Sequence, residues 1–345
     1  MTIVYMPCRQ CGFLLALVAT LLCAAAATAE DLVSEPVHPS GDPLVSRIGR
    51  YVQTKAEQFS QSDLEFSRSR SNAPFLPISF LSSAHYGDAT VREVGGDGGD
   101  PRFQQTSTSV AGGLPFLLGP SDGVVLGFYA NHSRFKVDNP GPLVDDEFDV
   151  TVGAVALGYL KQLNPDWQLM GFLMPLHNDS DLAGGASYWQ TMGGAFARYT
   201  ASDRLWWMAG VFADTSPYDR YWLPYLGFSW TLSERWTVSG VLPWPQVIYA
   251  PSRDWFVGVG GALSGSGWAV DLGSGAVNMD LNAFDLGVHI NRRIYGVLWG
   301  SLSAGVGGLR ALQIESGTDI EGPEFAVSSS PFVRIEFTVR PGDLF

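Results

Sequence analysis

The segment Pro331-Phe-Val-Arg-Ile-Glu-Phe-Thr-Val-Arg-Pro-Gly-Asp-Leu-Phe345 alternates between apolar and polar side chains. Successive side chains of a strand point to opposite faces, so Val333, Ile335 and Phe337 share one face. The other face is polar and carries Arg334, Glu336, Thr338 and Arg340. This pattern is typical of a strand with lipid on one side and a wet lumen on the other. An edge strand of a soluble β-sandwich can alternate in the same way, so the segment leaves both folds open.

The first 29 residues have the features of an export signal. Arg9 is their only charge, an apolar run follows it, and Ala27-Thr28-Ala29 matches an A-x-A cleavage site. We expect cleavage after Ala29. Leu22 precedes Cys23, where a lipoprotein signal needs a small residue, so lipidation is the weaker alternative. The apolar run is also short for a retained membrane span.

Cysteine usage and net charge exclude several classes of function. The three cysteines, Cys8, Cys11 and Cys23, all lie in the signal, so the rest of the chain has no disulfide, thiolate nucleophile or Cys-based metal site. The formal net charge of −13 disfavours binding to nucleic acid. We expect no metal and no cofactor, because no zinc-ligand pair, phosphate-binding loop or dinucleotide motif is present.

The chain is apolar overall but nowhere continuously apolar after the signal. Charged residues make up 16% and hydrophobic residues 46% of the sequence, whereas soluble proteins have about a quarter charged residues. No later apolar run reaches the length of a membrane helix. Strands of a membrane barrel have this composition, because only every second residue meets lipid. A soluble periplasmic β-sandwich remains the alternative fold.

We divide the chain into a signal (1–29), a polar periplasmic extension (30–73, with a possible short helix over 44–59) and a strand-rich region (74–345). In the last region one unit recurs: a strand, a short polar turn, and an aromatic residue that opens the next strand. The aromatic residues after these turns are Trp167, Trp206, Trp236, Trp255 and Tyr295. Their position predicts a belt of aromatic side chains at a membrane interface.

Longer linkers separate the strands at the opposite end, over 87–101, 136–147, 177–186, 264–280 and 306–330. Short turns on one side and long loops on the other are typical of bacterial outer-membrane barrels. We predict about fourteen antiparallel strands, over 75–86, 104–118, 122–135, 148–161, 167–176, 187–200, 204–213, 221–232, 236–242, 245–250, 255–263, 281–291, 294–305 and 331–340. The pair over 236–250 is the weakest, because Leu242-Pro-Trp-Pro-Gln246 cannot form a regular ladder. Without that pair the barrel has twelve strands.

Charged side chains on the predicted inner faces are the candidate lumen and selectivity residues. They are Asp149, Lys161, Asp285, His289, Arg334, Glu336 and Arg340. One interpretation is a constriction that selects solutes by charge. The other is a solvated or mutually paired network that fills the barrel.

An enzyme is a further alternative, since barrel lipid hydrolases use Ser and His on one strand face. His132 and Ser133 are adjacent and therefore face opposite sides. Ser83 and His85 share a face, but no carboxylate nearby in sequence would orient the His. We therefore expect no enzyme and no catalytic residues.

With these features in place, residues 74–345 resemble a bacterial outer-membrane β-barrel. Within them, Leu223 to Tyr249 is similar to porin-like barrels known only as a domain of unknown function. The resemblance implies an outer-membrane location in a Gram-negative-type envelope, with outer-membrane lipid, lipopolysaccharide and the barrel-assembly machinery as partners. Phe337 and Phe345 would form the assembly signal, although Pro341 to Leu344 depart from the usual ending. The expected function is a passive pore for small polar solutes. The alternatives are a closed structural barrel with a plugged lumen and a lipid-modifying enzyme, and the oligomeric state stays open.

Overall fold

A computed structural model describes residues 54, 57–58, 61–64, 71–73, 77–93, 101–138, 145–182, 184–218, 220–242, 244–271, 276–316 and 321–340. The expected signal, most of the expected 30–73 extension, and Phe345 lie outside these residues. Of the possible helix over 44–59, Thr54, Glu57 and Gln58 are described, and they are helical. Among the described residues, no helix is long and apolar enough to cross a membrane.

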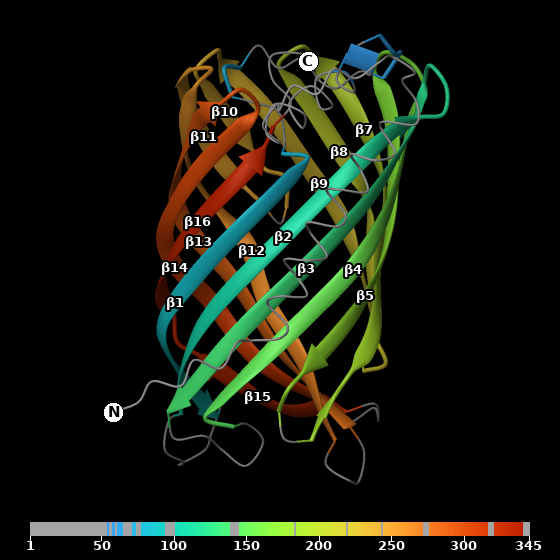
Figure 1. Ribbon diagram of the computed structural model, residues 1–345. Helices are drawn as coiled ribbons and strands as arrows, with labels where there is room; N and C mark the ends of the chain where they lie inside the picture. Colours follow the sequence, from blue (N-terminus) through green and yellow to red (C-terminus); the bar gives the residue numbers. More distant parts are fainter. Residues whose placement is uncertain are drawn as a thin grey trace, which may run out of the picture. The chain divides into compact units, whose positions relative to one another are not determined.

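The described chain is built from long strands in one sheet (Figure 1). The strands are β1 (Ser79–Glu93), β2 (Arg102–Leu117), β3 (Asp122–Asp138), β4 (Glu147–Gln162), β5 (Trp167–Ser180), β6 (Gly185–Ala186), β7 (Tyr188–Ser202), β8 (Leu205–Thr215), β9 (Arg220–Ser233), β10 (Trp236–Ser239), β11 (Gln246–Ser252), β12 (Trp255–Asp271), β13 (Ala276–Tyr295), β14 (Leu298–Ser316), β15 (Glu321–Val327) and β16 (Ser330–Val339).

Antiparallel pairing closes this sheet into a barrel. β16 pairs with β1 from Ser79↔Val339 to Tyr86↔Phe332, so the last strand meets the first. β15 continues the line of β16, because both pair with β14. β6 is a two-residue piece against β12. The ring therefore has fourteen strands, which confirms the predicted antiparallel β-barrel of about fourteen strands.

The predicted strands all occur, but several are longer than the alternation indicates. The linkers expected over 264–280 and 306–330 are largely strand, because β12, β13 and β14 have 17, 20 and 19 residues and β15 follows them. Most of 177–186 is also strand. The pair expected to be weakest belongs to the wall but is short: β10 has 4 residues and β11 has 7. Pro245, just before β11, cannot donate a ladder hydrogen bond.

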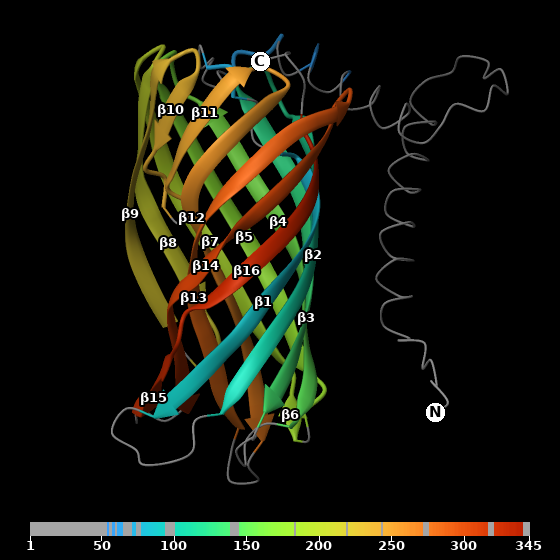
Figure 2. The ribbon, with the colours of Figure 1, turned by 90° about the vertical axis from the view of Figure 1, so that its left-hand side faces the viewer.

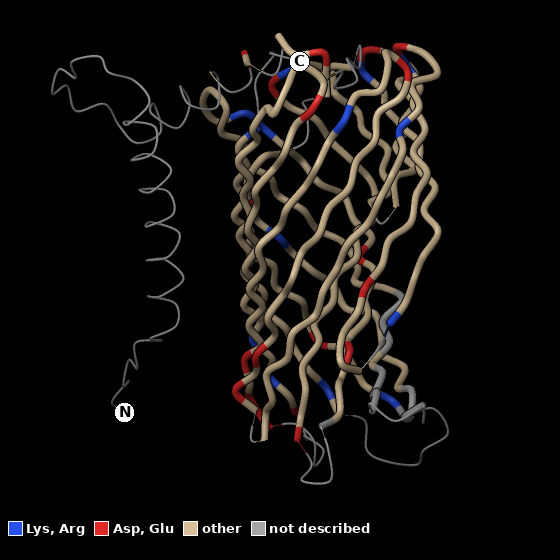
Figure 3. The backbone as a smooth tube through the Cα atoms, turned by 90° about the vertical axis from the view of Figure 1, so that its right-hand side faces the viewer, with Lys and Arg blue, Asp and Glu red and all other residues tan. Residues whose placement is uncertain are grey.

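The outer wall of the barrel is apolar between two charged rims. On β16, the outward side chains of Val333, Ile335 and Phe337 are exposed, as the alternation predicts. Exposed Leu and Val side chains continue this surface around the ring, including Val155, Leu157, Leu286 and Leu302. Lys, Arg, Asp and Glu residues gather toward the two ends of the wall (Figure 3). An apolar band between polar rims is the surface that a bilayer requires of a β-barrel.

Candidate functional site

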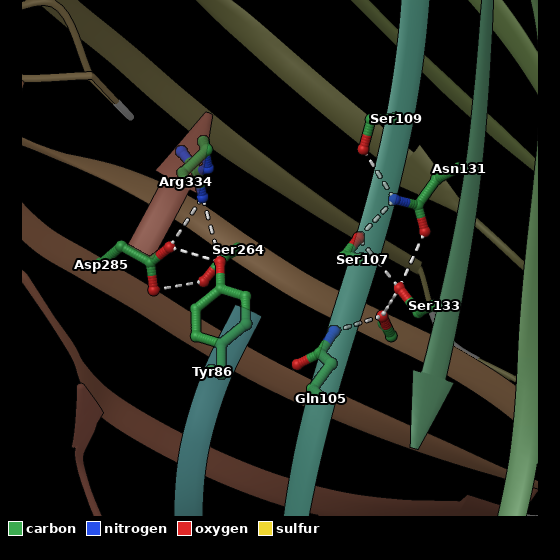
Figure 4. Close-up of polar contacts among 10 residues, drawn as sticks. Tyr86, Gln105, Ser107, Ser109, Asn131, Ser133, Ser264, Asp285 and Arg334 are labelled. Carbon is green, nitrogen blue, oxygen red and sulfur yellow. Dashed lines mark hydrogen bonds and ion pairs between the residues drawn. The ribbon is translucent and has the colours of Figure 1, made fainter. Parts of the chain in front are cut away.

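The interior of the barrel holds a charged cluster on β1, β12, β13 and β16 (Figure 4). Asp285 is 3% exposed and accepts hydrogen bonds from the Tyr86 hydroxyl at 2.7 Å and the Ser264 hydroxyl at 2.7 Å. Arg334 donates to the same carboxylate at 3.0 Å and to the Tyr86 oxygen at 3.0 Å. The carboxylate is thus paired with a cation and two hydroxyls, which offset the cost of burying a charged group.

A second polar network lies beside this cluster on β2, β3 and β12 (Figure 4). The Asn131 amide donates to the Ser107 and Ser109 hydroxyls, both at 2.7 Å. The Ser133 hydroxyl donates to the Asn131 carbonyl oxygen at 3.0 Å. Gln105 and Ser266 extend the network to β12. One side of the lumen is therefore lined by hydroxyl and amide groups.

A third group of inward residues lies near the short turns. The Arg340 guanidinium lies 5.5 Å from the Phe256 ring centre and 5.9 Å from that of Trp299, and its Nε donates to Thr338. His289 contacts the edge of Phe256. A guanidinium beside aromatic rings gains cation–π stabilisation, so this side chain is held in place.

The outer end of the lumen is filled by a cluster of buried apolar side chains, which we call the apolar plug. Its members are Ala89, Phe103, Phe135, Phe148, Val150, Leu182, Trp268, Val270, Met279, Leu281 and Val327. The rings of Phe148 and Trp268 have centroids 5.2 Å apart, and those of Phe135 and Trp268 are 5.4 Å apart. In the ring of strands β12 lies seven steps from β4, but beyond the short strands β10 and β11 its outer end pairs with β6 and lies close to β4 and β5. The side chain of Trp268 therefore meets those of Phe135 and Phe148, and the cluster obstructs the lumen at this end.

The remaining side of the lumen, on β5, β7, β8 and β9, is aromatic. Phe172 stacks on Phe196 with ring centroids 6.2 Å apart, and Phe196 meets Tyr225 edge-on at 5.0 Å. Phe212 lies 6.3 Å from Phe172. We call these four residues the aromatic wall. The middle of the lumen is thus polar on one side and aromatic on the other.

Five of the seven candidate lumen and selectivity residues have side chains on inward faces of the strands. Asp285, His289, Arg334, Glu336 and Arg340 all lie on inward faces, and the first and third form an ion pair. The side chains of His289 and Glu336 make no hydrogen bond within the described part of the chain. Glu336 lies between the two arginines on the same face of β16.

Asp149 and Lys161 lie on the outward face of β4, so the expectation that they line the lumen is wrong. They share the face of Val155 and Leu157, which are more than half exposed. The inward face of β4 is also apolar, because it contributes side chains to the plug. The alternation of apolar and polar residues therefore does not show which face of β4 points into the lumen. The outward charges are paired at the two ends of the strand, with Arg134 at 3.0 Å and with Asp122 at 3.1 Å.

Four of the five expected interface aromatics are exposed near the short turns: Trp167, Trp236, Trp255 and Tyr295. The expectation is wrong for Trp206, which alternates with the exposed Trp207 and shares the inward face of Asp214. Adjacent tryptophans occupy both faces of β8, so the sequence alone does not say which of the two meets lipid. Phe337 of the expected assembly signal faces outward, and Phe345 lies outside the described residues.

The sequence did not indicate Tyr86, Ser264, Trp268 or the aromatic wall as parts of the site. Tyrosine and serine occur on either face of a barrel strand, so their type carries no signal of direction. Asn131 was a sequence signal of a polar lumen. Its amide lies on the face of β3 opposite that of Ala130, which points outward.

The catalytic alternatives gain no support from the geometry. His132 faces outward and lies 3.6 Å from Asp149, whereas Ser133 is fully buried and faces inward. His85 contacts Thr106 on the outward face. Within the described residues, no three His, Cys, Asp or Glu side chains are placed to hold a metal ion.

No protein-family model matches the chain, and no curated protein matches its sequence. Solved barrels are similar at low identity. They include a deletion mutant of the monoaromatic hydrocarbon channel TodX (TM-score 0.45, 10% identity, 76% of this chain and 89% of that one) and an outer-membrane channel from Pseudomonas putida F1 (TM-score 0.41, 8% identity, 76% and 96%). A FadL homologue from Pseudomonas aeruginosa has a TM-score of 0.37 at 9% identity, covering 76% and 90%. At these scores the likenesses carry no argument about the function of this chain.

Proposed function

We propose that the protein is an outer-membrane channel that passes small polar solutes passively and is closed at its outer end by the apolar plug. The observation that carries this proposal is the Asp285–Arg334 pair inside a lipid-facing wall, beside a continuous lining of hydroxyl and amide groups. Such groups replace the water around a solute and discriminate by charge. The proposal includes export by the 1–29 signal, assembly through the C-terminal strand, and contact with outer-membrane lipid and lipopolysaccharide.

The plug makes the proposal testable by conductance in a planar bilayer. We expect small or rare steps from the unmodified protein and larger, more frequent steps from Trp268→Ala, because this side chain packs against Phe135 and Phe148 in the plug. Trp222→Ala is the matched control, since Trp222 is 72% exposed on the outward face of β9 and leaves the lumen unchanged.

A closed structural barrel is the second candidate function, and the plug favours it. The same recordings separate the two. If folded, inserted protein is silent both with and without Trp268, the channel proposal fails and the structural barrel stands. If Trp268→Ala conducts, we expect Arg334→Gln to shift its ion selectivity toward cations.

A further inference from the structure

The hydrogen-bonded wall is interrupted between β9 and β12. The two strands between them, β10 and β11, occupy only the end near the short turns (Figure 2). β10 pairs with β9 only from Ser229 onward, and β11 pairs with β12 only up to Gly260. Beyond these points, among the described residues, Trp222–Gly227 of β9 and Ala262–Trp268 of β12 have a strand partner on one side only.

The direction of the backbone groups shows which residues face the interruption. The Gly240 N–H donates to the Phe228 carbonyl, whereas Thr231 donates to Arg204 on the β8 side. Even-numbered residues of β9 therefore direct their backbone toward β10, and farther along the strand toward the interruption. Pro224 is one of them. Because proline has no N–H, this position removes a donor at the edge that has no partner strand.

The interruption is bounded at both ends. Near the short turns, the Gly261 N–H donates to the Pro245 carbonyl. At the outer end, β6 pairs with Ala269 and Val270 of β12, and the Tyr188 hydroxyl fills the space that a side chain on Gly267 would occupy. The bounded region is therefore a feature of the folded wall, with its own border, and not a frayed strand end.

The border is apolar outside and opens toward the aromatic wall inside. Outward side chains beside it are among the most exposed apolar groups of the barrel: Trp222 at 72%, Leu226 at 64% and Leu263 at 64%. Leu223 faces inward, since it pairs with the aromatic-wall residue Phe212, yet it is 52% exposed. Tyr225, which lies two residues further along β9, belongs to the aromatic wall.

An open sheet edge in contact with hydrocarbon leaves backbone groups unsatisfied and costs several kcal/mol for each, so such edges occur only where they line a water-filled or ligand-filled space. We propose that the interruption is a side opening through which small, flat apolar or amphipathic molecules pass between the membrane and a binding site on the aromatic wall. The apolar body would stack on Phe172, Phe196 and Tyr225. Polar substituents would face the hydroxyl and amide groups across the lumen.

Site-directed fluorescence in lipid vesicles tests the side opening. All native cysteines lie within residues 1–29, so after signal removal a single introduced cysteine is unique. Bimane would be attached to Leu223→Cys, facing inward beside the opening, in vesicles with nitroxide-labelled acyl chains. Leu226→Cys is the lipid-facing control on the same strand. Ser301→Cys is the inward control, on β14 and away from the opening.

We expect quenching at position 223 to approach that at 226 and to exceed that at 301 several-fold. Equal quenching at 223 and 301 would overturn the opening. Naphthalene, as a flat apolar probe, should reduce quenching at 223 and leave 226 unchanged, whereas sucrose should change neither. If naphthalene has no effect at 223, the binding site on the aromatic wall is excluded. Variants are compared only after migration on unheated gels shows that they are folded. These results do not depend on conductance, so the opening and the polar channel can fail separately.

Discussion

Replacing Asp285 with Ala should destabilise the barrel strongly, because it leaves the Arg334 cation without its counter-ion in the lumen. The carboxylate is 3% exposed and the Arg334 side chain 25% exposed. Removing one partner of a buried pair costs about 3–5 kcal/mol. Because Arg334 keeps some contact with water, we expect the lower end of that range, near 3 kcal/mol. The loss includes two hydrogen bonds, from Tyr86 and Ser264.

The pairing itself is measured by a double-mutant cycle with Arg334→Met. The double variant removes both charges, so its loss of unfolding free energy should be smaller than the sum of the losses in the two single variants. We expect a coupling energy of about 2 kcal/mol. The measurement is equilibrium unfolding in urea from lipid vesicles, followed by tryptophan fluorescence. Coupling below about 0.5 kcal/mol would refute the view that these charges stabilise each other.

The outward pair Arg134–Asp149 is the matched control for this cycle. Its atoms are equally close, at 3.0 Å, but the Arg134 side chain is 46% exposed. Pairs of this kind contribute about 0.2–1 kcal/mol. The two cycles together separate the effect of burial from the effect of distance.

Two further predictions concern the stability of the folded barrel and its assembly. Gly305→Ala should lower the free energy of unfolding by about 1–3 kcal/mol, because the new Cβ would meet the Leu286 backbone carbonyl, which cannot move aside. Gly153→Ala, with nothing within 4 Å, should change it by less than about 0.5 kcal/mol in the same urea titration. Phe337→Ala should reduce the fraction of barrel assembled on unheated gels more than Ile335→Ala does, if Phe337 belongs to the assembly signal. Equal assembly of these two outward-face variants would remove it from that role.

Alternation and turn chemistry predicted the strands well, because both are local. Strand β16 shows this most clearly: its outward apolar face and inward charged face follow from a period of two. Proline likewise predicted the weakness of β10 and β11 without any knowledge of neighbouring strands. Alternation failed on β4, where Phe148 and Val150 face inward into the plug and the charges of Asp149 and Lys161 face outward.

The sequence by itself predicted a barrel of about fourteen strands, with twelve strands and a soluble sandwich as the alternatives, because strand period, turn residues and composition are properties of short segments. Only the tertiary structure decided that Trp268 meets Phe148, that Arg334 pairs with Asp285, and that the wall is interrupted between β9 and β12. Each of these joins residues on strands far apart in sequence. Their contact depends on how many strands close the ring and in what register, and no local pattern records either.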